Sequence, residues 1–179
     1  MKIIRNSLKN NLNIRTQKDY PTKGIEFIDI TPLLMQKEIF EEIIDKFINE
    51  IKNKEVEYII SPEARGFWFG PVIANKLDIG FIPVRKKGKL PPDVVECEFE
   101  YEKEYGIDRL ELPKLVDQEY KNKNFYIIDD IYATGNTMNG IKTAIENLGG
   151  NIKGMGVIIN IKELNNEKNV FSLIDINED

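Results

Sequence analysis

The amino-acid sequence contains no histidine and a single cysteine, Cys97. Histidine is the usual general base at neutral pH and the commonest zinc ligand, so its absence excludes Ser-His and Cys-His catalytic schemes and histidine-based zinc sites. One cysteine cannot form an internal disulfide or a multi-cysteine metal site, and we expect a reduced, packed thiol. An acid–base catalyst in this chain would therefore be a carboxylate, a tyrosine or a lysine.

Long apolar runs are lacking as well. No stretch approaches the roughly 18 apolar residues of a membrane span, and residues 1–17 contain no apolar signal-peptide core. The 25 basic residues are outnumbered by 30 acidic ones, and this net charge of −5 argues against a nucleic-acid surface at the level of the whole chain. We therefore expect a cytoplasmic protein that binds neither membranes nor nucleic acid, with one domain over residues 1–179.

The most informative stretch is FYIIDDIYATGNTM, residues 125–138. Four apolar residues predict a buried strand, the carboxylates of Asp129 and Asp130 follow it, and a helical pattern begins after a loop. Ligands of open α/β sheets bind at such strand ends, where the amides of a helix N-terminus can hold a phosphate. Carboxylates would repel a phosphate unless they face hydroxyls or a cation, so the ligand should resemble a sugar phosphate. The loop residues expected to hold the phosphate are Ala133, Thr134, Gly135, Asn136 and Thr137.

This order of residues resembles the 5-phosphoribosyl-1-pyrophosphate (PRPP) signature of the type I phosphoribosyltransferases: four apolar residues, two acids, an apolar pair and Ala-Thr-Gly-x-Thr. Asn136 replaces the family's usual second glycine, but asparagine tolerates positive φ and the loop should still form. The resemblance implies that Asp129 and Asp130 hold the ribose hydroxyls and, through water, a Mg²⁺ bound with PRPP, with no metal held directly by the protein. The alternative is a plain strand-to-helix turn with a solvated acid pair.

Two further loops carry cations. The first, Glu63-Ala64-Arg65-Gly66-Phe67, follows a predicted strand, and a guanidinium beside a glycine suits pyrophosphate. The second, the basic loop (residues 85–91, RKKGKLP), would attract a multiply charged leaving group or simply be solvated. Both resemble pyrophosphate loops of the adenine phosphoribosyltransferases, and the resemblance suggests a non-proline cis peptide between Glu63 and Ala64 and an Arg85 that could reach across a dimer interface. The residues it implies for pyrophosphate binding are Glu63, Ala64, Arg65, Arg85, Lys86 and Lys89.

Residues 19–34, DYPTKGIEFIDITPLL, resemble the adenine-binding hood of the same family. The resemblance implies that the backbone of Glu26 and Ile28 reads the edge of adenine while Phe27 stacks on its ring. Phe27 could instead be a core residue, and the arginine that the family often has at the position of Ile28 is missing. Thr31 is expected to be the N-cap of the following helix.

Residues 92–112 alternate between acidic and apolar side chains, which predicts a flexible two-stranded lid outside the main sheet. Glu104 matches the family's catalytic glutamate in Glu-Tyr-Gly, and Tyr105 matches a lid tyrosine. The residues alone would not single out Glu104, because four other glutamates alternate along the same run. The resemblance assigns it proton exchange with the base.

Strand-like and helical patterns alternate along the chain, which predicts an α/β fold with the parallel sheet of the type I phosphoribosyltransferases. The strand-like runs are residues 56–60, 81–84, 125–128, 152–161 and 170–174, and the helical ones include 33–53 and 141–148. We expect the last strand at a sheet edge, an irregular helix within residues 1–17, a hood over about 1–34 and a lid over about 92–112.

The resemblance, which covers roughly residues 16–175, implies a homodimeric enzyme that makes AMP and pyrophosphate from adenine and PRPP. Because the hood would read the base through its backbone, the sequence leaves open a 6-oxopurine acceptor such as hypoxanthine, guanine or xanthine. A non-catalytic regulator that senses PRPP is the more distant alternative.

Overall fold

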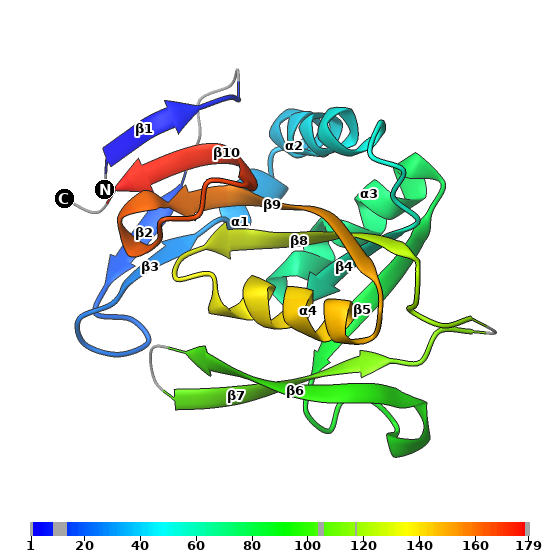
Figure 1. Cartoon of the computed structure of the whole chain (residues 1–179). Coiled ribbons are helices and arrows are strands. Elements are labelled where there is room, and N and C mark those ends of the chain that lie inside the picture. Colours follow the sequence, from blue (N-terminus) through cyan, green and yellow to red (C-terminus); the bar gives the residue numbers. More distant parts are fainter. Residues whose placement is uncertain (1, 9–13, 104–105, 117, 178–179) are drawn as a thin grey trace.

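The computed structural model describes residues 2–8, 14–103, 106–116 and 118–177. These residues form an eight-stranded sheet in the order β1-β10-β9-β8-β4-β5-β7-β6 and a separate pair, β2-β3 (Figure 1). The strands are β1 (Lys2–Asn6), β2 (Arg15–Lys18), β3 (Glu26–Asp29), β4 (Tyr58–Pro62), β5 (Gly80–Lys86), β6 (Val95–Lys103), β7 (Gly106–Pro113), β8 (Asn124–Tyr132), β9 (Asn151–Ile161) and β10 (Val170–Asn177). The helices are α1 (Thr31–Leu34), α2 (Lys37–Ile51), α3 (Gly70–Leu77) and α4 (Asn136–Asn147), with 3₁₀ turns η1 (Arg65–Trp68), η2 (Pro92–Val94) and η3 (Lys162–Leu164).

The centre of the sheet is parallel, as the alternation of strands and helices predicts. Strands β10, β9, β8, β4 and β5 run in one direction. Helices α2 and α3 lie on one side of the sheet and α4 on the other (Figure 1). Successive apolar residues face opposite sides: Ile59 and Ile128 pack in the cluster of α2 and α3, whereas Ile60 and Ile127 pack in that of α4. Both faces are therefore buried, which explains the continuous apolar runs of β4 and β8.

The predicted helix over residues 33–53 is interrupted near Met35, so α1 and α2 form in its place. Along α2 the side chains of Ile39, Ile43, Phe47 and Ile51 are buried at helical spacing, which gives this helix its apolar face toward the sheet. None of the helices in the described parts of the chain is both long and apolar enough to cross a membrane.

The expected amino-terminal helix is wrong, and so is the expectation that the last strand lies at the edge. β1 pairs antiparallel with β10 and becomes the edge strand, while β2 pairs with β3 in the small second sheet. Leu8, just after β1, is buried in the core. An uncovered β10 would leave a row of backbone donors and acceptors without partners, and β1 satisfies them.

The lid strands form a hairpin, β6-β7, but its predicted place outside the main sheet is wrong. β7 pairs antiparallel with β5 at Arg85–Glu111 and Lys86–Leu110, so the hairpin extends the sheet beyond β5 (Figure 1). Leu110 and Leu112 are buried in the same apolar cluster as α4. The burial of these two side chains attaches the hairpin to the body. The alternation of acidic and apolar residues in the sequence does not predict it. The flexibility of the hairpin stays a prediction.

Candidate active site

The acid pair, Asp129 and Asp130, forms the sixth and seventh of the nine residues of β8, which continues past the predicted apolar run to Tyr132. Asp130 is only 3% exposed, and its Oδ2 lies 2.9 Å from Nε of Arg65. That oxygen has no aligned hydrogen-bond donor within the described residues, although the guanidinium lies beside it. The Asp130 backbone amide donates to Asp129 Oδ1 at 2.8 Å, which orients the Asp129 carboxyl group against the backbone of its neighbour.

Burial makes both carboxyl groups harder to ionise. It raises the pKa of Asp129 well above the ordinary value of 3.8, and the neighbouring Asp130 charge raises it further. Burial also raises the pKa of Asp130, while Arg65 opposes that shift. A cation or a pair of hydroxyl donors placed against the acid pair would relieve this cost, so the electrostatics suit a diol or a metal that arrives with a ligand.

The phosphate loop (residues 133–137) follows directly and leads into α4. Gly135 has φ +83°, and a Cβ there would lie 2.2 Å from the Tyr132 hydroxyl, so only glycine fits. Asn136, where the PRPP signature usually has glycine, is the first residue of α4 and does not need a left-handed backbone. The loop encloses a small cavity of about 90 Å³ lined by Asp129 and residues 131–138. Amides at the start of α4 are available there for an anion.

A side chain that the sequence does not single out, Asn165, ties this loop to the neighbouring strand. Its Nδ2 donates to the Ala133 carbonyl at 2.9 Å, to the Ile161 carbonyl at 2.9 Å and to Asn160 Oδ1 at 3.0 Å. Asn165 therefore sets the position of the loop's first residue relative to the end of β9. The only hint in the sequence is an asparagine after a strand, which is too common to carry a prediction.

The first pyrophosphate loop leaves β4 with the predicted cis peptide between Glu63 and Ala64, a prediction that the structure confirms. The Glu63 carboxylate accepts hydrogen bonds from Arg85 Nε at 2.8 Å and from the Lys86 amide at 3.0 Å. Burial opposes ionisation of this carboxyl, but the hydrogen bonds from Arg85 and Lys86 outweigh it and lower the pKa. Glu63 is thus engaged in holding the start of the basic loop.

The basic loop turns tightly after β5. Gly88 has φ +76°, and the Lys89 amide donates to the Lys86 carbonyl at 3.0 Å, which closes the turn. Within the described residues, the ammonium groups of Lys86 and Lys89 form no ion pair. Two of the predicted pyrophosphate ligands therefore keep their charge available for an anion.

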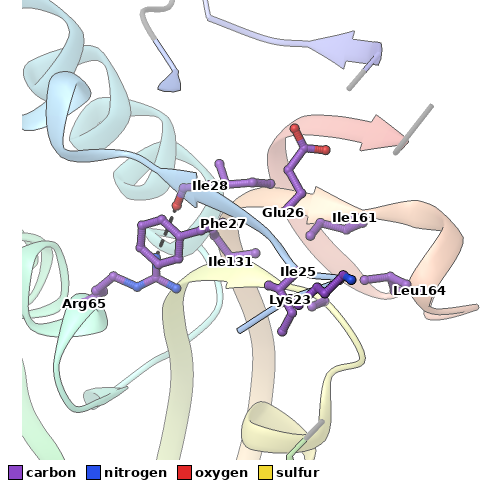
Figure 2. A pocket seen from close by; sticks show the side chains of 11 residues that line it. Lys23, Ile25, Glu26, Phe27, Ile28, Arg65, Ile131, Ile161 and Leu164 are labelled. Atoms are coloured by element: carbon purple, nitrogen blue, oxygen red, sulfur yellow. Dashed lines mark hydrogen bonds between the residues drawn. The ribbon is translucent and has the colours of Figure 1, made fainter. Parts of the chain in front are cut away.

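A cavity of about 460 Å³ lies beneath the hood, and Figure 2 shows its lining. The lining residues are Lys23, Gly24, Ile25, Glu26, Phe27, Ile28, Arg65, Ile131, Ala133, Ile161 and Leu164. The wall is apolar where β8 and β9 end, which suits a flat heterocycle. Ala133 belongs to both this cavity and the smaller phosphate-loop cavity, so the two spaces are adjacent.

The free edge of β3 faces this cavity. The Ile28 carbonyl accepts a hydrogen bond from Arg65 Nη1 at 3.4 Å, so it points away from β2. In an antiparallel pair, the N–H and C=O groups of alternate residues point the same way, so the backbone of Glu26 also faces this edge. The side chain of Ile28 is 5% exposed and packs in the core instead.

Phe27 is not a core residue, because it remains partly exposed and lines the cavity. The Arg65 guanidinium lies over its ring, 5.4 Å from the centroid (Figure 2), and the Tyr20 ring meets it edge-on at 5.2 Å. Arg65 therefore contacts Phe27, the Ile28 carbonyl and Asp130 at once. One guanidinium joins the hood to the acid pair.

Asp29 anchors the hood to the body. It accepts a hydrogen bond from the Thr31 amide at 2.8 Å and another from the Thr31 hydroxyl, and Arg15 pairs with it at 2.9 Å. The predicted N-cap role of Thr31 is wrong, because Ile30 is the cap residue and Thr31 begins α1. The Thr31 hydroxyl binds the preceding aspartate in place of a helix amide.

The sequence profile of the phosphoribosyl transferase domain matches residues 31–177. The chain belongs to this family. A relative, the adenine phosphoribosyltransferase of Clostridium acetobutylicum, is 43% identical over 153 residues, which cover 86% of this chain and 87% of that protein.

Solved structures of the family agree in fold. The adenine phosphoribosyltransferase of Thermoanaerobacter pseudethanolicus is 37% identical and superposes with a TM-score of 0.83 over 91% of this chain and 95% of that one. The Saccharomyces cerevisiae enzyme, crystallised with an imino-altritol bisphosphate and adenine, is 33% identical, with a TM-score of 0.77 over 89% and 93% of the two chains. The type I phosphoribosyltransferase fold predicted from the signature is thereby confirmed.

Most of the predicted site residues of this family member gather at the carboxyl edge of the parallel strands. The acid pair, the phosphate loop, Arg65 and the β3 edge surround two adjacent cavities. Arg85 and Lys86 are joined to this group through Glu63. Glu104 and Tyr105 lie outside the described residues, so their predicted roles are carried by the resemblance alone.

Proposed function

We propose that this protein is an adenine phosphoribosyltransferase, which transfers the phosphoribosyl group of PRPP to adenine and releases AMP and pyrophosphate. The observation that carries the proposal is the position of Arg65, whose guanidinium contacts the hood at Phe27 and Ile28 and the acid pair at Asp130. A base under the hood and a ribose phosphate on the acid pair would therefore meet beside a cation, where the diphosphate of PRPP must leave.

In the reaction, N9 of adenine would form a bond to the anomeric carbon while the bond from that carbon to the diphosphate oxygen breaks and its electron pair leaves with pyrophosphate. Negative charge develops on the leaving group, and we assign its stabilisation to the cations of Arg65, Arg85, Lys86 and Lys89. The carboxylates of Asp129 and Asp130 would hold the two ribose hydroxyls and offset positive charge on the sugar ring. Glu104 would take the proton that the base loses.

For the base, we assign recognition to the free edge of β3. The backbone N–H and C=O groups of Glu26 and Ile28 would pair with the ring nitrogen and the 6-amino group, while the ring of Phe27 covers one face of the base. The apolar wall made by Ile131 and Leu164 would cover the other side. Tyr105 in the lid would help to exclude water, since an activated ribosyl donor is readily hydrolysed.

We further propose that Mg²⁺ enters with PRPP. The raised pKa values of Asp129 and Asp130 suit a nearby cation, but two carboxylates are too few to cage Mg²⁺ by themselves. The ion would therefore be held mainly by the diphosphate and reach the acid pair through water. When bound it supplies charge neutralisation at the leaving group.

A homodimer and a cytoplasmic location complete the proposal. Met35 and Trp68 keep 75% and 36% of their surface exposed, which is apolar area that a second copy could cover. Arg85 is held by Glu63 of its own chain, and its reach into a partner's site stays part of the proposal. A charged diphosphate donor does not cross membranes unaided, which favours the cytoplasm as the place of reaction.

The decisive experiment incubates the purified protein with Mg²⁺, PRPP and one purine base at a time, and follows AMP formation and pyrophosphate release. We expect turnover with adenine and much less with guanine, hypoxanthine or xanthine. Turnover of a 6-oxopurine without adenine would replace our assignment with the alternative base class. An Asp129→Asn protein purified in parallel controls for the host's own enzyme, because it should lose the activity.

A further inference from the structure

Glu111 on β7 is a buried carboxylate that the proposed mechanism does not use. It is only 5% exposed, yet its partners are backbone amides: Gly88 donates to Oε1 at 2.8 Å and Leu90 donates to Oε2 at 3.3 Å. Both amides belong to the basic loop. Each oxygen of one carboxylate therefore holds a different point of the loop, on either side of Lys89.

The same strand also holds the beginning of the loop. In the β5-β7 pair, Glu111 stands opposite Arg85, and the Lys87 amide donates to the Arg109 carbonyl at 3.1 Å. The loop is thus fastened to β7 from its first residue, Arg85, to its sixth, Leu90. These contacts use backbone atoms of the loop, so the side chains of Lys86 and Lys89 stay available to project from the turn.

Other glutamates of the hairpin behave differently. Glu98 and Glu100 face solvent and pair with the side chains of Lys87 and Arg109. Such exposed ion pairs contribute little to stability. Glu111 is the buried one among these three, and burying a carboxylate is costly unless charge-assisted hydrogen bonds and nearby cations compensate it.

A purely structural role would be to close the turn, but the turn already closes itself through the Lys89 amide and the Lys86 carbonyl. What the carboxylate adds is negative charge directly behind a segment that carries Arg85, Lys86, Lys87 and Lys89. This charge offsets the mutual repulsion of the four cations and lets them stay close together in the absence of a ligand.

We propose that Glu111 is a positioning residue for the diphosphate of PRPP: it holds the basic loop in the conformation that directs Lys86 and Lys89 at the leaving group. The inference rests on the proposed function, in which this loop binds pyrophosphate. It makes the β7 strand, and hence the lid hairpin, a support for the leaving-group site and not only its cover.

The test compares Glu111→Gln with a matched variant, Glu100→Gln, which removes an exposed hairpin carboxylate paired with Arg109. The glutamine keeps the size of the side chain, but its NH₂ group faces one of the two loop amides and its charge is gone. Calorimetry would measure binding of inorganic pyrophosphate with Mg²⁺ and, separately, of ribose 5-phosphate. Steady-state assays would measure KM for PRPP and for adenine.

For Glu111→Gln we expect pyrophosphate affinity to fall about tenfold or more, as the loss of a charge-assisted hydrogen bond predicts. KM for PRPP should rise with it. Affinity for ribose 5-phosphate and KM for adenine should remain those of the wild type. Glu100→Gln should leave all four quantities unchanged. General loosening of the fold would weaken the binding of ribose 5-phosphate as well as that of pyrophosphate. A loss confined to pyrophosphate and PRPP would therefore indicate the positioning role.

Unchanged pyrophosphate affinity, or an equal loss for both ligands, would overturn the inference. If thermal melting shows that Glu111→Gln is not folded, Glu111→Asp takes its place, because aspartate keeps the charge but withdraws the carboxylate from the loop. Binding of pyrophosphate by Glu111→Asp with wild-type affinity would also overturn the inference. A wild-type protein that binds pyrophosphate but makes no AMP refutes the proposed function, whereas active wild type with an unaffected variant refutes this inference alone.

Discussion

The phosphate loop and the hood border adjacent cavities, but they are built in different ways. The phosphate loop joins β8, which is paired with β4 on one side and β9 on the other, to a 12-residue helix. Among the residues that the structure describes, the hood strands β2 and β3 pair only with each other, and every side chain of β2 is exposed. The sugar-phosphate half of the site is therefore fixed by the core, whereas the base half rests on a small sheet.

Within the described residues, polar contacts between that small sheet and the body are few, and Ile28 is the β3 side chain that packs in the core. Asp29 binds Thr31 at the start of α1, and Arg65 reaches the Ile28 carbonyl and the Phe27 ring. Elements with little buried surface open at low free-energy cost. From this comparison we infer that the acid pair and the phosphate loop form a preformed cradle for the sugar phosphate, whereas the hood closes around the base. Each of the following changes tests one side of this difference.

The largest effect is expected from Asp129→Asn. Loss of a charged acceptor for the ribose should reduce kcat/KM for PRPP by roughly a hundredfold, about 3 kcal/mol of transition-state stabilisation. The folded protein should nevertheless become more stable. Because the folded-state pKa of Asp129 is raised above 3.8, ionisation of this group costs stability as the pH rises from 3.8 through the raised pKa, and asparagine avoids that cost.

Thermal melting at several pH values, together with initial rates, checks this prediction. The gain in melting temperature of the variant over the wild type should grow as the pH rises and vanish in acid near pH 3.8. A variant less stable than the wild type at neutral pH would mean that the acid pair supports the fold, and the description of a costly preformed cradle would be incorrect.

A matched pair of glycines gives the next prediction. Gly135 and Gly24 both have positive φ, +83° and +94°, but a Cβ on Gly135 would meet the Tyr132 ring whereas one on Gly24 would meet nothing within 4 Å. We expect Gly135→Ala to cost about 2–4 kcal/mol, from backbone strain plus overpacking. Gly24→Ala should cost about 1 kcal/mol, from backbone strain alone.

Urea unfolding measures both free energies of unfolding, and ribose 5-phosphate binding reports on the cradle. Only Gly135→Ala should weaken that binding. Equal costs for the two substitutions would indicate that the phosphate loop adjusts as readily as the hood, and the proposed contrast in rigidity would be lost.

The difference between the two halves also decides what could be predicted from the sequence. The strand, acid pair and phosphate loop are contiguous in residues 125–138, so their pattern specifies the local structure directly. The cis peptide was implied by the resemblance of residues 63–67 to a loop of the family, and the parallel sheet was predicted from the alternation of strand-like and helical patterns. Even in residues 125–138 the strand extends further than expected, since β8 keeps its pairing with β9 to Tyr132.

Features that depend on distant partners were not predictable. The residues of β1 have no distinctive sequence pattern, and they form a strand because they pair with the edge of β10, from the other end of the chain. Asn165 acts on Ala133, 32 residues earlier, and Glu111 acts on Gly88, 23 residues earlier. Attachment of the lid hairpin to β5 depends on the burial of Leu110 and Leu112, which an acidic run conceals. Such contacts are set by packing, which local patterns do not encode.

A smaller effect is expected from Phe27→Ala in the hood. Removal of the ring should raise KM for adenine about tenfold, because an aromatic contact with the base is lost. KM for PRPP should stay the same. Tyr20→Ala is the matched control: this residue is 53% exposed and touches Phe27 only edge-on, so its loss should change KM for adenine less. Equal changes in both KM values would show that the two halves of the site are not separable.

The smallest effect is expected from Asp29→Asn, and its sign should be opposite to that of Asp129→Asn. Hydrogen bonds from Thr31 lower the pKa of Asp29 below 3.8, so this carboxylate stabilises the folded hood at pH values above 3.8 and the contribution is lost as the pH falls through the lowered pKa. The side chain is 26% exposed, so we expect a loss of less than about 1 kcal/mol at neutral pH.

Melting curves of wild type and Asp29→Asn should therefore differ at pH 7 and converge in acid below pH 3.8, with a modest rise in KM for adenine and unchanged ribose 5-phosphate binding. A stabilised Asp29→Asn protein would contradict the anchoring role. Two aspartates would then behave alike, although desolvation and a neighbouring like charge raise the pKa of one and hydrogen bonds from Thr31 lower the pKa of the other. Opposite signs would instead show that ionisation of Asp129 destabilises the folded protein until a ligand binds, whereas ionisation of Asp29 stabilises it.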